Sequence, residues 1–209
     1  MLVGFFEDVE PCRVSDGPTV NGGAMKVGTL VLLLALVTAP ACGGGGGSST
    51  GPGGSPSPLS ASFVPDQPTP GAKTVAMLQA SKSNDVVSVY VTLTDTTGVF
   101  ATAFDVVFDS AGAAYLGFTH GAAFEAGGNT PAYTVDGSSN PGRIVVGIAR
   151  TNGTTTNIVG SKAILTLQFR VTQAGTNQVV LQNGVVVNAQ PTPQPIPGIL
   201  WFAGALTGV

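Results

Sequence analysis

VSVYVTLT, residues 87–94, alternates strictly between apolar and polar side chains. Valines and one leucine take the odd positions, and serine, tyrosine or threonine take the even ones. A period of two is the spacing of a β-strand that buries one face and leaves the other in water. We therefore predict a half-buried strand here, with Tyr90 on its polar side.

The same alternation recurs in FDVVF (residues 104–108) and LTLQFRV (165–171), and turn signals such as Asn140-Pro141-Gly142 separate the apolar segments. No segment carries a long apolar stripe of period 3.6, so little helix is expected. Residues 61–209 are predicted to fold as one all-β domain, a nine-stranded antiparallel jelly-roll β-sandwich. The remaining strands are expected at Val75–Ser81, Ala114–Thr119, Ala132–Asp136, Arg143–Arg150, Asn177–Leu181 and Leu200–Thr207.

The composition excludes some classes of partner. Only 9% of the 209 residues are charged, and the net charge is −3. No basic stripe is present to pair with phosphates, so nucleic acid is not expected as a partner. The two cysteines, Cys12 and Cys42, are too few for a disulfide framework.

An apolar run ends close to the lone Cys42, which five glycines follow. From Met25, MKVGTLVLLLALVTAPAC has one basic residue, a short apolar core and small residues, the pattern of a secretory signal over residues 25–41. The apolar core is too short to span a hydrocarbon layer of ~30 Å. Residues 39–42, APAC, resemble a bacterial lipobox, in which the cysteine thiol is acylated and becomes the new N-terminus. The alternatives are a plain signal cleaved after Ala41 and a short buried helix.

These features predict an exported protein held at the bacterial cell envelope or surface by a lipid anchor on Cys42. Two or more acyl chains give the stable membrane attachment that one chain does not. Residues 42–60, rich in Gly, Ser and Pro, are expected to form a flexible tether. Residues 1–24 lack the charge pattern of a signal, and we interpret them as a disordered, over-called start that precedes Met25.

Three segments together resemble the cohesin domain family. Val87–Phe124 is similar to the first half of a cohesin, with alternating valines, an xxFxxxFD strand and an apolar strand ending in a Gly turn. Pro141–Val171 resembles the middle strands, and Pro195–Val209 the closing strand. The resemblance covers residues 75–209.

The resemblance implies a nine-stranded jelly roll, related in fold to carbohydrate-binding modules, that binds dockerin modules through one sheet face. It places Ala101 and Ala103 where dockerin-binding members usually carry Asn or Asp. The expected partner is a dockerin-like or other protein, and the expected role is protein association at the cell envelope, with a link to polysaccharide breakdown. The outward positions expected on that one face are Ala103, Asp105, Val107, Val145, Gly147, Thr166, Gln168 and Arg170, of which Asp105, Val107, Val145, Gln168 and Arg170 are the predicted contact residues.

The alternative function is that of a carbohydrate-binding module. Such modules commonly stack exposed aromatic rings on pyranose faces, and Tyr90, Tyr133 and Trp201 are the candidates. Tyr90 lies on the polar side of its strand. The sequence does not decide whether Trp201 or its neighbour Phe202 faces outward.

Catalysis is not expected. His120 is the only histidine, and a triad or a histidine metal site needs further partners. The carboxylates lack the D-x-D spacing of a calcium loop. Asp109 follows a strand, where a cap on the next turn is favoured over a partner contact. We predict a non-catalytic protein with no cofactor and no metal.

Overall fold

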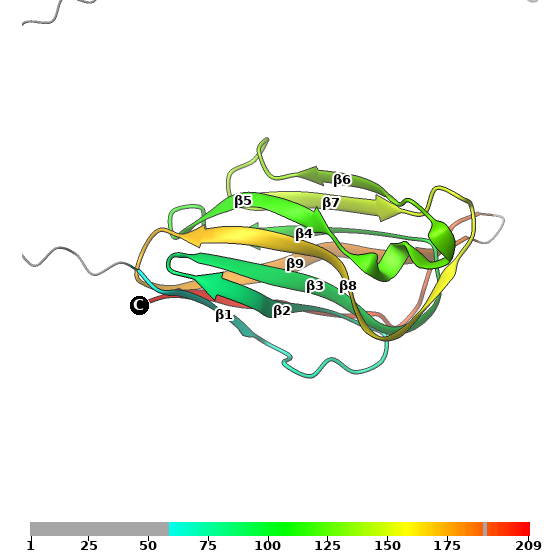
Figure 1. The fold of residues 1–209 in the computed structure, drawn as a ribbon, viewed down its shortest axis with the longest axis horizontal. Coiled ribbons are helices and arrows are strands. Elements are labelled where there is room, and N and C mark those ends of the chain that lie inside the picture. The colour runs from blue at the N-terminus through cyan, green and yellow to red at the C-terminus, as the bar shows by residue number, and fades with distance from the viewer. Residues whose placement is uncertain (1–58, 190–191) are drawn as a thin grey trace, which may run out of the picture. The chain divides into compact units, whose positions relative to one another are not determined.

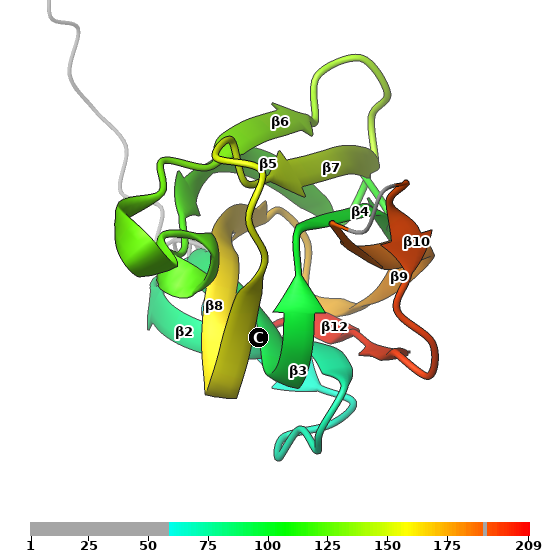
Figure 2. The same cartoon turned by 90° about the vertical axis from the view of Figure 1, so that its right-hand side faces the viewer.

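The computed structural model describes residues 59–189 and 192–209. These residues form two β-sheets packed face to face (Figures 1 and 2). Cys42, the predicted signal over residues 25–41 and most of the predicted tether lie outside the described residues. None of the helices in the described part is long and apolar enough to cross a membrane.

One sheet has seven strands and the other five. The seven-stranded sheet runs, in spatial order, β1 (Ala61–Pro65), β12 (Gly204–Gly208), β9 (Gly175–Asn188), β4 (Ala101–Phe108), β7 (Arg143–Ala149) and β6 (Ala132–Asp136), with β10 (Gln194–Pro195) paired to β9. The five-stranded sheet runs β11 (Leu200–Phe202), β2 (Thr74–Ser83), β3 (Val86–Val99), β8 (Thr156–Val171) and β5 (Ala113–His120). Two short 3-10 turns, η1 (Ala122–Phe124) and η2 (Ala126–Gly128), join β5 to β6.

The structure confirms the predicted sandwich and contains every strand expected from the sequence. It adds the short strands β1 and β10, and it divides the last expected strand into β11 and β12. The division arises because the chain changes sheets there: β11 pairs in parallel with β2, and β12 pairs antiparallel with β1 and β9. Gly204 makes the crossing possible, since it has φ 157° and a Cβ there would collide with the carbonyl oxygen of Val64.

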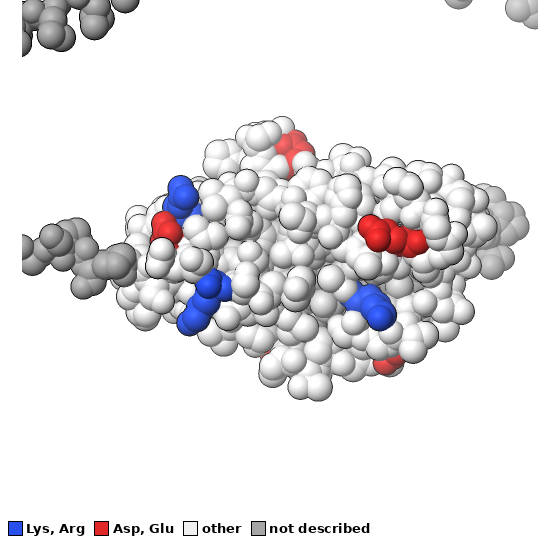
Figure 3. Space-filling view, in the orientation of Figure 1, with Lys and Arg blue, Asp and Glu red and all other residues white. Residues whose placement is uncertain are grey.

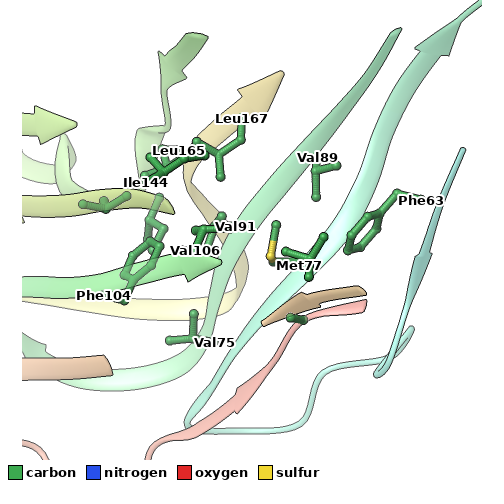
Figure 4. Close-up of a cluster of buried hydrophobic side chains, with 14 of the residues drawn as sticks. Phe63, Val75, Met77, Val89, Val91, Phe104, Val106, Ile144, Leu165 and Leu167 are labelled. Carbon is green, nitrogen blue, oxygen red and sulfur yellow. The ribbon is translucent and has the colours of Figure 1, made fainter. Parts of the chain in front are cut away.

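The core lies between the two sheets. The apolar side chains of residues 87–93 are fully buried, as their alternation predicts. They meet buried side chains of β4 and β7 across the sandwich, and this packing is the main source of stability. Figure 4 shows part of the cluster, including Val89, Val91, Leu165 and Leu167 of the five-stranded sheet and Phe104, Val106 and Ile144 of the seven-stranded sheet.

Arg150 closes one end of the sandwich, and no acidic side chain of the described residues pairs with it. Its side chain is buried, and it donates hydrogen bonds to the carbonyl oxygens of Phe124 (2.8 Å), Ala126 (2.8 Å) and Thr154 (2.9 Å). Asn129 also donates to the Phe124 carbonyl oxygen, at 3.0 Å. These bonds fix η1 and η2 over the end of the core.

Candidate functional site

The outer side of β9, β4, β7 and β6 presents mainly small and apolar side chains. Paired residues in neighbouring strands point to the same side of a sheet, so the register defines this surface. Val145 and Val180 are 39% and 45% exposed. Exposed apolar side chains that lie together are typical of interaction sites. We call this surface the β4 face. Its small or uncharged members are Ala101, Ala103, Val107, Ala132, Thr134, Val145, Gly147, Ala149, Val180, Val185 and Val187, and the same register also places Asp105, Asp136, Arg143 and Gln182 on it.

A polar cluster lies within the β4 face. One carboxylate oxygen of Asp105, Oδ2, accepts hydrogen bonds from Nη2 of Arg143 (2.7 Å) and Nδ2 of Asn183 (2.6 Å). These contacts leave Asp105 only 4% exposed, whereas the Arg143 side chain is 46% exposed. The cluster therefore presents a neutralised arginine, rather than a free carboxylate, to a partner.

The pKa of Asp105 is lowered in the folded protein. The hydrogen bond from Asn183 is the largest cause, and the hydrogen bond and positive charge of Arg143 add to it against the opposing effect of burial. Asn183 reaches Asp105 because β9 carries one extra residue opposite Ala103 and Asp105, and Asn183 takes φ +52° there. A bulge of this kind changes the direction of a side chain, and here it directs Asn183 toward Asp105.

The structure divides the predicted contact residues between two surfaces. Asp105, Val107 and Val145 belong to the β4 face. Gln168 and Arg170 lie on β8, which pairs with β3 and β5 in the other sheet, as does Thr166. The prediction that all of them share one face is therefore wrong.

A second correction concerns exposure. Asp105 does occupy an outward position of β4, as the alternation predicts, but it is buried because the side chains of Arg143 and Asn183 cover it. The residues that sequence reasoning missed are Arg143, Asn183 and Val180. A signal for one of them was present: Asn183-Gly184 interrupts the period of two in β9, and Asn-Gly is a common mark of irregular strand geometry.

The three rings considered for sugar stacking are not brought together. Tyr90 is 42% exposed on the outer side of the five-stranded sheet. Tyr133 is half-buried, and its hydroxyl donates to the Gly121 carbonyl oxygen at 2.9 Å. Trp201 is also half-buried, with its ring centroid 5.7 Å from that of Phe104.

His120 and Asp109, two titratable residues outside the cluster, both make contacts within the domain. His120 is exposed and stacks in parallel on the Tyr133 ring, with centroids 4.0 Å apart. The carboxylate of Asp109 accepts a hydrogen bond from the Ala111 backbone N–H at 2.9 Å, so the predicted turn cap is confirmed. In the described part of the chain, no three His, Cys, Asp or Glu side chains lie close enough to hold a metal ion.

The two packed sheets place this protein in the class of jelly-roll β-sandwich domains. The model of the cohesin domain matches residues 73–204, and the chain belongs to the cohesin domain family. No curated protein matches the chain.

Several solved cohesin structures are similar to this chain. A non-cellulosomal cohesin from the hyperthermophilic archaeon Archaeoglobus fulgidus has 16% identity and a TM-score of 0.44, with 69% of this chain and 88% of that chain covered. The third cohesin of ScaC, in complex with the ScaB dockerin from Acetivibrio cellulolyticus, has 16% identity and a TM-score of 0.46, with coverages of 57% and 86%. The cohesin CaCohA2 from Clostridium acetobutylicum has 14% identity and a TM-score of 0.47, with coverages of 65% and 87%.

Proposed function

We propose that this protein is a non-catalytic protein-binding module of cohesin type, and that its partner docks on the β4 face. The observation that carries the proposal is the group of exposed apolar side chains there, with Val145 and Val180 beside a neutralised Arg143. Burying apolar area of this kind provides most of the free energy of protein association. The half-exposed Arg143 side chain, held by Asp105, would give the partner a polar group to contact, and its charge is already paired.

The partner is a dockerin-like module or another protein with an apolar docking surface. In one of the similar structures a cohesin is seen in complex with a dockerin. Here Ala101 and Ala103 supply no hydrogen-bonding side chains at positions where the family resemblance leads us to expect Asn or Asp. The proposed interface therefore depends on shape and apolar contact in this part of the β4 face, and it selects a partner that is correspondingly apolar.

The setting that we propose is the bacterial cell envelope. The lipobox-like residues before Cys42 support export and lipid anchoring, and the Gly-rich segment that follows supports a tether. Tethered association at the envelope would suit the assembly of proteins that act on polysaccharides. Mass spectrometry of the mature N-terminus should find an acylated Cys42; an unmodified N-terminus at another residue would exclude the anchor.

Docking is tested with single charges placed on the β4 face. Val145→Asp and Val180→Asp would each bury an unpaired carboxylate in the interface. We expect affinity for a captured partner, measured by surface plasmon resonance, to fall at least about tenfold, as for central interface residues. Dockerin modules are the first partners to be tested, followed by proteins captured from the native secretome. The matched control is Tyr90→Ala on the opposite sheet, which should bind the partner as the wild type does.

Two results would contradict the proposed site. One is unchanged affinity in both aspartate variants. The other is an equal loss in Tyr90→Ala, which would move the interface to the five-stranded sheet.

A further inference from the structure

The outer side of the five-stranded sheet contains a hollow that the proposed protein interface does not use. It encloses about 220 Å³ and lies where β3, β8 and β5 run side by side. We call it the β5 hollow; it is lined by Ser88, Leu116, Gly117, Phe118, Thr119, Thr166 and Gln168.

A bulge in β5 creates this hollow. Between Tyr115 and Gly117 the strand has one more residue than β8 opposite it, and Leu116 is left 40% exposed. Gly117 has φ +143°, and a Cβ at this position would find open space within 4 Å. The missing side chain therefore leaves a depression, with Leu116 at its side.

An exposed aromatic ring stands beside the hollow. The register places Tyr90, Thr166 and Thr119 in one row across β3, β8 and β5. The next row on the same side consists of Ser88, Gln168 and Gly117. Neighbours within such a row lie about 5 Å apart, so the Tyr90 ring, 42% exposed, borders the polar side chains of the hollow.

The polar side chains of the hollow are free to bind a ligand. No hydrogen bond joins the side chains of Ser88, Thr119, Thr166 or Gln168 to any other group in residues 59–189 and 192–209. Three hydroxyls and one amide provide both donors and acceptors, and none of them carries charge. A ligand with many hydroxyl groups could both donate hydrogen bonds to these side chains and accept hydrogen bonds from them.

Charge is kept away from the centre of this surface. Figure 3 views the outer side of the five-stranded sheet: the charged side chains lie toward the two ends and at the upper and lower edges, and the middle has none. The charged residue on β8 next to the hollow, Arg170, is engaged with Asp85 at 3.2 Å. An anionic or cationic ligand would find no counter-charge in the hollow.

We propose that the β5 hollow binds a neutral polysaccharide. A pyranose ring has an apolar C–H side and a rim of hydroxyls, which match the Tyr90 ring and the hydroxyl and amide groups beside it. Leu116 would contact the next sugar along the chain. Because the hollow and the β4 face belong to different sheets, a polysaccharide and a protein partner would bind independently.

The test is native affinity electrophoresis of the full-length chain in gels that contain xylan, galactomannan or mixed-linkage β-glucan, with anionic polygalacturonate as the charged comparison. The hexasaccharide of any polymer that retards the chain is then titrated by calorimetry. We expect retardation by at least one neutral polymer, and a dissociation constant at least about tenfold higher for Tyr90→Ala, the loss expected for one aromatic contact with its buried area. Val145→Asp, on the β4 face, should bind the sugar unchanged.

A second variant distinguishes a loss of sugar binding from a folding defect. Ser88→Tyr fills the hollow and leaves Tyr90 in place, and it should also abolish retardation while keeping the wild-type melting temperature. The proposal is overturned if no neutral polymer retards the chain, if only polygalacturonate does, or if Tyr90→Ala and Ser88→Tyr bind as tightly as the wild type. Loss of sugar binding with intact protein binding in Tyr90→Ala would separate this site from the β4 face.

Discussion

Replacing Arg150 by methionine should destabilise the domain by about 3 kcal/mol. The hydrogen bond to the Phe124 carbonyl oxygen is buried, whereas those to Ala126 and Thr154 are partly buried. A buried bond from a charged donor contributes ~2 kcal/mol, and the two partly buried bonds, which water replaces in part, add ~1 kcal/mol each. Relief from burying the guanidinium offsets ~1 kcal/mol of this sum. Methionine retains an apolar stem, so the loss reports the hydrogen bonds.

The assay is reversible unfolding followed by circular dichroism, in guanidinium chloride for the free energy and by heating for the melting temperature. At 2–4 °C per kcal/mol for a domain of this size, the melting temperature should fall by roughly 6–12 °C. Arg170→Met is the matched control, because Arg170 pairs with Asp85 in an exposed contact, and exposed pairs contribute about 0–1 kcal/mol. A loss below about 1 kcal/mol in Arg150→Met, or one equal to that of the control, would refute the role assigned to these bonds.

Two further predictions concern Asp105 and Gly184. The folded-state pKa of Asp105 lies below its ordinary value of 3.8, so its charged form stabilises the fold above pH 3.8 and this contribution is lost as pH falls through the folded-state pKa. The difference in unfolding free energy between wild type and Asp105→Asn should therefore narrow between pH 6 and pH 2, and a constant difference would contradict the linkage. A Cβ on Gly184 would collide with the Trp201 ring, so Gly184→Ala should cost about 1–3 kcal/mol and shift the fluorescence of this sole tryptophan. Gly71→Ala, which meets nothing within 4 Å, is the control, and equal stability of the two variants would show that Trp201 does not pack on Gly184 as described.

The sequence predicted the strands because alternation is a local property. Residues 87–94 reveal their buried side without reference to any other segment, and the structure buries that side completely. Alternation does not reveal which sheet a strand joins. Gln168 does point away from the core, as expected, but the pairing of β8 with β3 and β5 carries it to the opposite side of the sandwich from Val145. Strand pairing depends on contacts between segments far apart in the chain, and the pattern within one strand does not show which segment it will pair with.

Both candidate sites arise where the period of two is interrupted. In β9, one extra residue turns Asn183 toward Asp105, which buries the carboxylate and leaves Arg143 as an exposed polar group beside the apolar side chains of this face. In β5, one extra residue turns Leu116 outward and opens the hollow at Gly117. A bulge changes the direction of a side chain while the strands around it continue to bury the core. Regular alternation therefore builds the scaffold, and the two added residues give its opposite faces different chemistry, one apolar and suited to protein, the other hydroxyl-rich and suited to a neutral sugar.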